Sequence, residues 1–161
     1  MKIVFSGGGT LGPVTPLLAL REIIQSHDSS AMFLWVGTTQ GPERQVVEAA
    51  GIPFVTLSSG KFRRYLSIWN VTDIARIVIG FFQSFIFLWK YKPDLCISAG
   101  GYISVPLHAA AWLLGIPTWV HQQDIDTGLA NSFMAPLASQ ITTALESQIK
   151  YFSKRKVLWL G

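Results

Sequence analysis

Short runs of apolar residues alternate with longer amphipathic stretches along the 161-residue chain. The apolar runs contain few polar positions, which is typical of strands buried on both faces of a parallel sheet. The amphipathic stretches carry apolar residues at helical spacing and are bounded by proline and glycine. We expect strands at residues 3–5, 31–36, 54–57, 94–98, 118–122, 141–145 and 157–160. We expect helices at residues 13–25, 42–50, 71–91, 103–114, 127–137 and 148–152.

This alternation predicts an α/β fold, a Rossmann-like doubly wound parallel sheet with helices on both faces. The length fits one domain, and no fixed repeat or internal linker is evident. The chain stops at Gly161, where we expect a strand to end. We therefore expect it to be part of something larger.

The composition excludes several classes of protein. Half of the residues are hydrophobic and 14% are charged, with 6 Trp and 10 Phe, whereas disordered chains are rich in charge and poor in aromatics. The single Cys96 excludes a disulfide scaffold, and we expect it to be inert inside its apolar strand. We expect no metal site and no cofactor.

The net charge of +4 is concentrated around the expected helix 71–91. Asp73 is the only acid between residues 61 and 92. Basic residues beside an aromatic helix favour an anionic membrane surface over nucleic acid, and no nucleic-acid-binding motif is present. The basic residues of this span are Lys61, Arg63, Arg64, Arg76, Lys90 and Lys92.

The same helix has two apolar stripes. A helix on a sheet buries one stripe, and we expect it to be the one with Ile74, Ile77 and Val78, which continues through Phe81, Phe85 and Leu88. The second stripe, with the first basic residues, forms the expected membrane patch: Lys61, Arg63, Arg64, Arg76, Ile79, Phe82, Ile86 and Trp89. The uncharged run 77–89 has 13 residues, and a span needs about 20. We therefore expect the helix to lie on a membrane rather than to cross it.

Residues 7–12 match the pattern G-x-G-x-x-G between an expected strand and an expected helix. Glycines in such a loop let the backbone approach phosphate oxygens. Dinucleotide binding needs an acid at the end of the second strand, and none follows before Glu43. No Gly-Lys-Ser/Thr follows, which excludes a P-loop. The motif therefore gives little support for a dinucleotide oxidoreductase. The alternative that residues 7–12 form a tight turn without a ligand stays open.

Two further loops follow expected strands. Gly100 and Gly101 open a helix as a second possible anion cradle, or serve only close packing of the backbone. The segment 121–131 is a polar cluster in which Asp124 or His121 can act as a general base. For His121 alone, a hydrogen-bonded histidine at the strand end is the plainer reading. His108, on a helix among alanines, reads as a packing residue.

Together these segments resemble the bacterial GlcNAc transferase family of peptidoglycan synthesis. The likeness covers essentially the whole chain. The segments that carry it, in order, are Gly8 to Pro16, Tyr91 to Asp94, Gly100 to Pro106, Leu114 to Pro117, His121 to Asp124 and Gly128 to Asn131.

The resemblance implies the N-terminal half of a GT-B glycosyltransferase, in which two Rossmann-like domains enclose the site. This chain, residues 1–161, matches only the N-terminal acceptor- and membrane-binding domain; the C-terminal donor-binding domain is absent from it. The family transfers GlcNAc from UDP-GlcNAc, with inversion, to the MurNAc-pentapeptide carried on undecaprenyl diphosphate, which converts lipid I to lipid II. It works as a peripheral protein on the cytoplasmic face of the cell membrane.

The resemblance also assigns residues. Thr10, Leu11, Gly12 and Asp124 are expected to contact the donor or its diphosphate, with Asp124 and His121 as the catalytic candidates. The acceptor-side set is Gly8, Gly9, Gly100, Gly101, Tyr102, Gln122, Gln123 and Asn131.

The chain departs from the family pattern at three points. The family's first loop reads Gly-Gly-Thr-Gly-Gly-His, whereas Leu11 replaces a glycine here and Pro13 replaces the histidine. The third loop usually reads His-Glu-Gln-Asn, so the carboxylate stands two places later, at Asp124. We expect Asp124 to supply the negative charge of the usual glutamate.

Two alternatives stay open. The chain can be a non-catalytic subunit that binds the acceptor and anchors a separate donor-binding subunit, as in a split GlcNAc transferase. It can also belong to a related transferase with another lipid acceptor. Alone, without the donor domain, it is expected to be inactive.

Overall fold

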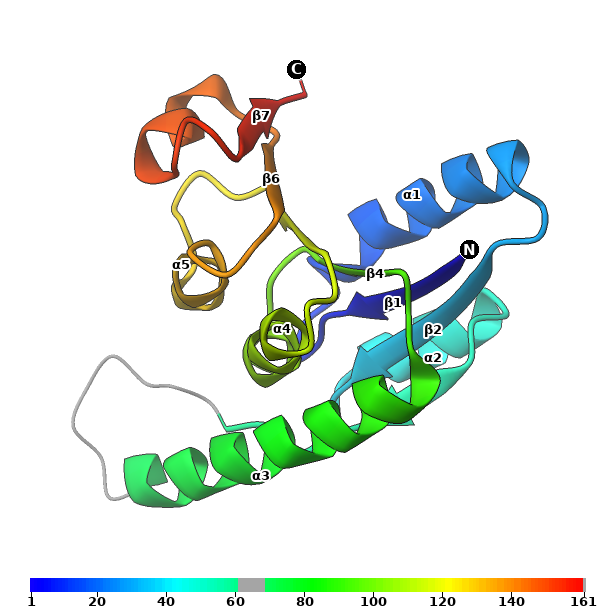
Figure 1. Ribbon diagram of the computed structural model, residues 1–161, viewed down its shortest axis with the longest axis vertical. Coiled ribbons are helices and arrows are strands. Elements are labelled where there is room, and N and C mark those ends of the chain that lie inside the picture. The colour runs from blue at the N-terminus through cyan, green and yellow to red at the C-terminus, as the bar shows by residue number, and fades with distance from the viewer. Residues whose placement is uncertain (61–68, 161) are drawn as a thin grey trace.

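The computed structural model describes residues 1–60 and 69–160, with the side chains of residues 1–60 and 74–160. The described strands form one parallel sheet in the order β3-β2-β1-β4-β5-β6-β7 (Figure 1). The strands are β1 (Lys2–Ser6), β2 (Met32–Gly37), β3 (Phe54–Thr56), β4 (Leu95–Ser98), β5 (Thr118–Gln122), β6 (Gln140–Thr143) and β7 (Val157–Trp159). The helices are α1 (Val14–His27), α2 (Glu43–Ala49), α3 (Trp69–Tyr91), α4 (Ser104–Leu113), α5 (Leu129–Met134) and the 3₁₀ helix η1 (Glu146–Tyr151). The predicted doubly wound parallel sheet is confirmed.

The apolar strand runs are buried on both faces of the sheet, as their sequences indicate. In β1, Ile3 and Phe5 pack in a core with Leu17 of α1 and Val47 of α2. Val4, between them, faces the opposite core with residues of α3 and α4. Figure 1 shows α1 on one side of the sheet and α3 and α4 on the other. All three β1 side chains are fully buried, so the central strand has no solvent-facing side.

The helix and the strand expected at 127–137 and 141–145 are longer than the observed ones, and the last short helix is shifted. The helix expected at 127–137 is α5 alone, because Gly128 has an extended backbone (ψ 148°) and Pro136 lies just beyond the helix end. The strand expected at 141–145 is β6. The short helix expected at 148–152 is the 3₁₀ turn η1, which starts two residues earlier.

Helix α3 packs on α4 and on the loop after β3 through its small and polar residues. A Cβ atom at Gly80 would overlap the Ser58 carbonyl oxygen, so glycine lets that loop cross the helix closely. The Ser58 N–H donates to Gln83 Oε1 at 2.8 Å, and Ser84 is fully buried. The residues that interrupt the apolar run in the sequence therefore mark where α3 meets the rest of the domain.

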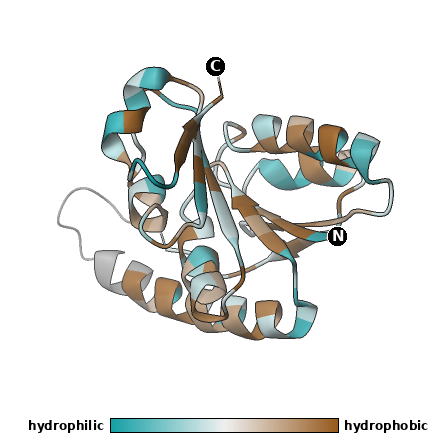
Figure 2. Cartoon of the chain, turned by 45° about the horizontal axis from the view of Figure 1, so that its top comes forward, coloured by the Kyte–Doolittle hydropathy of each residue, from teal (hydrophilic) through white to brown (hydrophobic). Residues whose placement is uncertain are grey.

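The outward stripe of α3 is exposed, as the sequence indicates, and Figure 2 shows apolar residues along this helix. Ile79, Phe82, Ile86 and Trp89 are 50–62% exposed. The expectation for the inner stripe is partly wrong. Ile74 and Val78 are about half exposed, because the residues of α3 that pack in the core against the sheet begin only at Phe81.

Among the described residues, one helix is long and apolar enough to cross a membrane by length and composition: α3, through its window Ile74–Tyr91. Only 17% of that window is buried in the domain. Lys61, Arg63 and Arg64, the first part of the expected membrane patch, lie outside the described residues.

Candidate functional site

The sequence-predicted loops meet at the carboxyl edge of the sheet. Strands β1 and β4 are neighbours, but the chain leaves β1 toward β2 on one side and later continues from β4 toward β5 on the other. Such a switch point leaves a crevice outside the carboxyl ends of the strands, where ligands bind in open α/β sheets. The first loop (residues 7–13) follows β1, the second (99–103) follows β4, and the third (123–128) follows β5.

The first and second loops touch through their backbones. Gly101 has a φ of +95°, and a Cβ atom there would lie 2.9 Å from the Gly8 nitrogen and 3.0 Å from its carbonyl oxygen. Real Cβ atoms essentially never come that close, so only glycine fits at 101. The two glycine motifs of the sequence are therefore one joint surface, with close backbone packing at its centre.

The tip of the first loop is exposed. Thr10, Leu11 and Gly12 are all exposed, and α1 begins directly after them with Pro13 as its N-cap. In this loop the positive φ falls at Gly9, at +85°, and not at Leu11. Leucine at this departure from the family pattern is therefore accommodated without backbone strain.

The third loop is held by a pair of side-chain amides. Asn131 Nδ2 donates to Gln122 Oε1 at 2.7 Å, and Gln122 Nε2 donates to the carbonyl oxygens of Asp124 at 2.8 Å and Asp126 at 3.1 Å. Asn131 is 5% exposed, and its Oδ1 has no hydrogen-bond partner among the described residues. The buried amide pair thus fixes the shape of a loop whose outer side chains face solvent.

The third loop and the start of α5 also reach the two glycine loops. A Cβ atom at Gly12 would lie 3.4 Å from Gln123 Nε2, and one at Gly100 would lie 3.5 Å from Asn131 Oδ1. Tyr102, at the end of the second loop, is half-buried just before α4. The structure therefore brings together residues of all three predicted loops.

The two catalytic candidates have different surroundings. The Asp124 side chain is exposed at the tip of the third loop, and its carboxylate has no hydrogen-bond partner among the described residues. His121 is half-buried, and its Nδ1 shares a 2.9 Å hydrogen bond with Thr142 Oγ1, which also accepts from Trp119 Nε1 at 2.8 Å. Burial lowers the pKa of His121, which favours the neutral ring.

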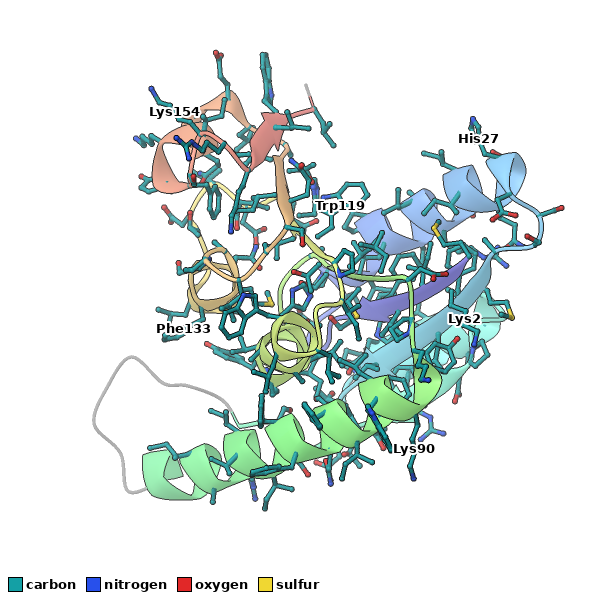
Figure 3. The ribbon with its side chains drawn as sticks, in the orientation of Figure 1. Lys2, His27, Lys90, Trp119, Phe133 and Lys154 are labelled. Carbon is teal, nitrogen blue, oxygen red and sulfur yellow. The ribbon has the colours of Figure 1, made fainter. Side chains whose placement is uncertain are left out.

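His121 faces a different side of the sheet from the amide pair. Side chains alternate along a strand, so His121 lies on the side of Trp119, which packs against the core beneath α1. Figure 3 shows Trp119 between β6 and α1. Gln122 points the opposite way, on the side of Val120 and α5.

Sequence reasoning missed one residue of the site, Glu43. In the sequence, Glu43 is notable only as an acid too far beyond the second strand to bind the ribose of a dinucleotide. The structure places its buried carboxylate beneath the first loop, where it accepts hydrogen bonds from Gly9 and Thr38. No local signal reveals this contact, because Gly9 is 34 residues away.

Two ionisable side chains, Cys96 and His108, are buried outside the site within the described residues. Burial raises the pKa of the Cys96 thiol to about 12, and His108 is fully buried in α4. Both agree with the packing roles expected for them.

Comparison with known proteins places this geometry in a family. Residues 3–143 match the model of the glycosyltransferase family 28 N-terminal domain. The chain belongs to glycosyltransferase family 28. The family 28 match takes in all three loops and every strand from β1 to β6.

Two curated relatives align with nearly the whole chain. Both are named UDP-N-acetylglucosamine–N-acetylmuramyl-(pentapeptide) pyrophosphoryl-undecaprenol N-acetylglucosamine transferase, the first as number 2 of its kind. The one from Bacillus cereus is 38% identical and the one from Shouchella clausii 42% identical, each over 160 residues. The match takes in 99% of this chain and 45% of each relative. The chain thus spans a little under half the length of the curated relatives it matches.

Solved structures show the same fold. MurG from Acinetobacter baumannii matches with a TM-score of 0.80 and 24% identity, over 98% of this chain and 44% of its own. A UDP-GlcNAc 2-epimerase from Neisseria meningitidis, bound to UDP-GlcNAc, matches with a TM-score of 0.74 and 13% identity, over all of this chain and 46% of its own. The family 28 domain and the epimerase therefore share a backbone framework.

Proposed function

We propose that the chain is the N-terminal half of a transferase that moves GlcNAc from UDP-GlcNAc to a MurNAc-pentapeptide on undecaprenyl diphosphate. The observation that carries the proposal is the 38–42% identity, across nearly the whole chain, to transferases named for this reaction. Because the chain matches 45% of those relatives, we propose that a donor-binding domain completes the site, in the same polypeptide or as a separate subunit. The domain alone is then an acceptor-side half without transfer activity.

The surface formed jointly by the three loops is the proposed substrate-binding surface, called the substrate wall below. Thr10, Leu11, Gly12 and Asp124 are all exposed, and Gly12 lies close to the neighbour of Asp124, Gln123. We propose that these four contact the donor. The backbone of Gly100, Gly101 and Tyr102 borders the acceptor side, with Gly8 and Gly9 behind it. Gln122 and Asn131 hold the third loop in place, and Gln123 links it to the first.

In the proposed reaction, the acceptor 4-hydroxyl oxygen attacks the anomeric carbon of GlcNAc as the bond to the UDP oxygen breaks. A general base takes the hydroxyl proton, and UDP leaves with the bonding electrons. Asp124 is the better-placed base, because its carboxylate is exposed and free of hydrogen bonds within the described structure. His121 is the second candidate. Its Nδ1 is engaged with Thr142, so any proton transfer would use Nε2.

The outward stripe of α3 is the proposed membrane contact. Its four large apolar side chains, Ile79, Phe82, Ile86 and Trp89, are exposed on one helix, with Arg76 and Lys90 exposed on the same helix. Apolar burial and attraction of basic residues to anionic lipid act together at such a surface, at about 1 kcal/mol per basic residue. We propose that, in this orientation, the substrate wall formed by the three loops lies near the cytoplasmic face of the membrane that carries the lipid acceptor.

A transfer assay with matched variants tests this function. Labelled UDP-GlcNAc and a lipid-linked MurNAc-pentapeptide are supplied to the protein that joins this chain to a donor domain, in cis or as a separate subunit. We expect Asp124→Asn to lower kcat by about 10²–10⁴-fold, the usual contribution of a general base. Asp126→Asn is the control, because Asp126 is exposed in the same loop and has no proposed role. Unchanged transfer by D124N would remove Asp124 from the mechanism, and transfer only to a different lipid-linked acceptor would replace the proposed substrate.

A further inference from the structure

Glu43 occupies the first glycine loop from inside the protein. It is the first residue of α2 and is fully buried. One carboxylate oxygen, Oε1, accepts the Thr38 N–H at 2.8 Å and the Thr38 hydroxyl at 2.5 Å. The other, Oε2, accepts the Gly9 N–H at 3.2 Å. The carboxylate thus ties the first loop to the end of β2.

The glycines around Glu43 are explained by this carboxylate. A Cβ atom at Gly8 or at Gly41 would overlap the Glu43 side chain. In a phosphate-binding loop, the glycines make room for a ligand and their N–H groups point at its oxygens. Here the room behind Gly8 and the N–H of Gly9 are already used by a side-chain carboxylate.

The charge of Glu43 also disfavours a phosphate at Gly8 and Gly9. No Lys, Arg or His forms an ion pair with it in the described parts of the chain, where the ion pairs are Met1–Asp28 and Arg44–Glu48. Its negative charge lies directly behind the loop, and like charges a few ångströms apart repel strongly where water is excluded. A phosphate at Gly8 and Gly9 would meet this repulsion and would find the Gly9 N–H occupied.

We propose that Glu43 is a positioning residue that stands in for a phosphate in the first glycine loop. It holds Gly9 and Thr38 from beneath, so that the loop presents Thr10, Leu11 and Gly12 to an uncharged part of the substrate. This inference rests on the proposed function for the nature of that substrate, where the uncharged part is a sugar ring. The diphosphate is then bound elsewhere than at Gly8 and Gly9.

The hydrogen bond from Gly9 to Glu43 is tested by replacing one carboxylate oxygen of Glu43 with an NH₂ group. Glu43→Gln keeps the side-chain size, and its amide oxygen can still accept both bonds from Thr38. Its NH₂ group then faces the Gly9 N–H, so only that bond is lost. In ¹⁵N–¹H spectra of the 161-residue chain, we expect the Gly9 proton to move upfield and to exchange at least tenfold faster, with a smaller change at Thr38. Glu48→Gln, on the exposed part of the same helix, is the control and should leave both amides unchanged. An unchanged Gly9 amide in E43Q, or equal changes at Gly9 and Thr38, would overturn the contact.

The exclusion of phosphate is tested on the unmodified chain. Pyrophosphate is titrated at constant ionic strength while the amides of Gly8, Gly9 and Thr10 are followed. We expect no saturable shift at these three amides. A saturable shift there would overturn the proposal. Neither measurement uses transfer activity, so a failed transfer assay with an intact Gly9 contact would count against the proposed function alone.

Discussion

The contact between the two glycine loops predicts an unusually large cost for one methyl group. Gly101→Ala adds a Cβ atom 2.9 Å from the Gly8 nitrogen, and it does so at a φ of +95°. Two separate penalties follow: the strain of a left-handed backbone at an L-residue, and a collision with main-chain atoms. Backbone atoms cannot rotate away as a side chain can, so the loops must move apart.

Matched glycine-to-alanine variants separate the free-energy cost of backbone strain from the cost of the collision. Gly115→Ala is the strain control, because Gly115 has a φ of +70° and nothing within 4 Å of its Cβ position. It should cost about 1–2 kcal/mol. G100A adds only an ordinary 3.5 Å contact with Asn131 and should resemble G115A. G101A should lose a further 1–3 kcal/mol or so, the usual cost of overpacking. The entropy that alanine removes from the unfolded chain is common to all three and cancels.

Urea unfolding of the three variants measures these differences. At about 2–4 °C per kcal/mol for a domain of this size, thermal melting should rank them in the same order. G101A should also weaken substrate binding, since its clash separates the first loop from the second. If G101A and G115A were destabilised equally, the backbone contact between the loops would be refuted.

Three further predictions concern the pH dependence of stability, binding to membranes and the activity of the isolated chain. Burial lowers the pKa of His108 to about 3, from an unfolded value near 6.5, so below pH 6.5 the unfolded chain binds a proton that the folded chain does not. Stability should therefore fall on acidification by about 1.4 kcal/mol per pH unit, some 2 kcal/mol by pH 5, and urea titrations should show a flatter profile in His108→Leu; parallel profiles would contradict the shift. The double variant F82D/W89D should abolish sedimentation with anionic liposomes, whereas D126N should leave the salt-sensitive binding unchanged; binding that ignores lipid charge and salt would argue against the α3 surface. The isolated chain should show no GlcNAc transfer in the radiolabel assay, and detectable transfer would contradict its role as half of a site.

Most of the fold follows from local pattern, because buried parallel strands carry a strong apolar signal. The runs at Ile3 to Phe5 and Thr118 to Gln122 were placed within a residue or two. The third loop and its helix are predicted less well, since Gly128 is still extended and α5 begins at Leu129, two residues after the predicted helix start. Propensity does not distinguish a polar loop from a first helical turn there.

The location of the candidate site can be predicted from the sequence, because the topology of the sheet determines where the loops meet. Parallel strands bring their carboxyl ends to one edge, so the convergence of the loops followed from the strand pattern. What could not be predicted was the packing between distant segments. The sequence does not show that Gly80 meets Ser58, and for that reason the inner stripe of α3 was assigned partly to Ile74 and Val78. Glu43 escaped notice for the same reason.

The position of β1 inside the sheet, between β2 and β4, has a consequence for the order of folding. β1 is made before the other described strands, and β2 and β3 can pair on one side of it early, but its neighbour on the other side, β4, begins only at Leu95. Helix α3 is therefore synthesised before the strand that completes the sheet beneath it. Pairings this distant in sequence are slow to close and leave apolar surface open in the meantime. During translation, the half-made domain thus presents a long apolar helix before the core that it packs on is finished.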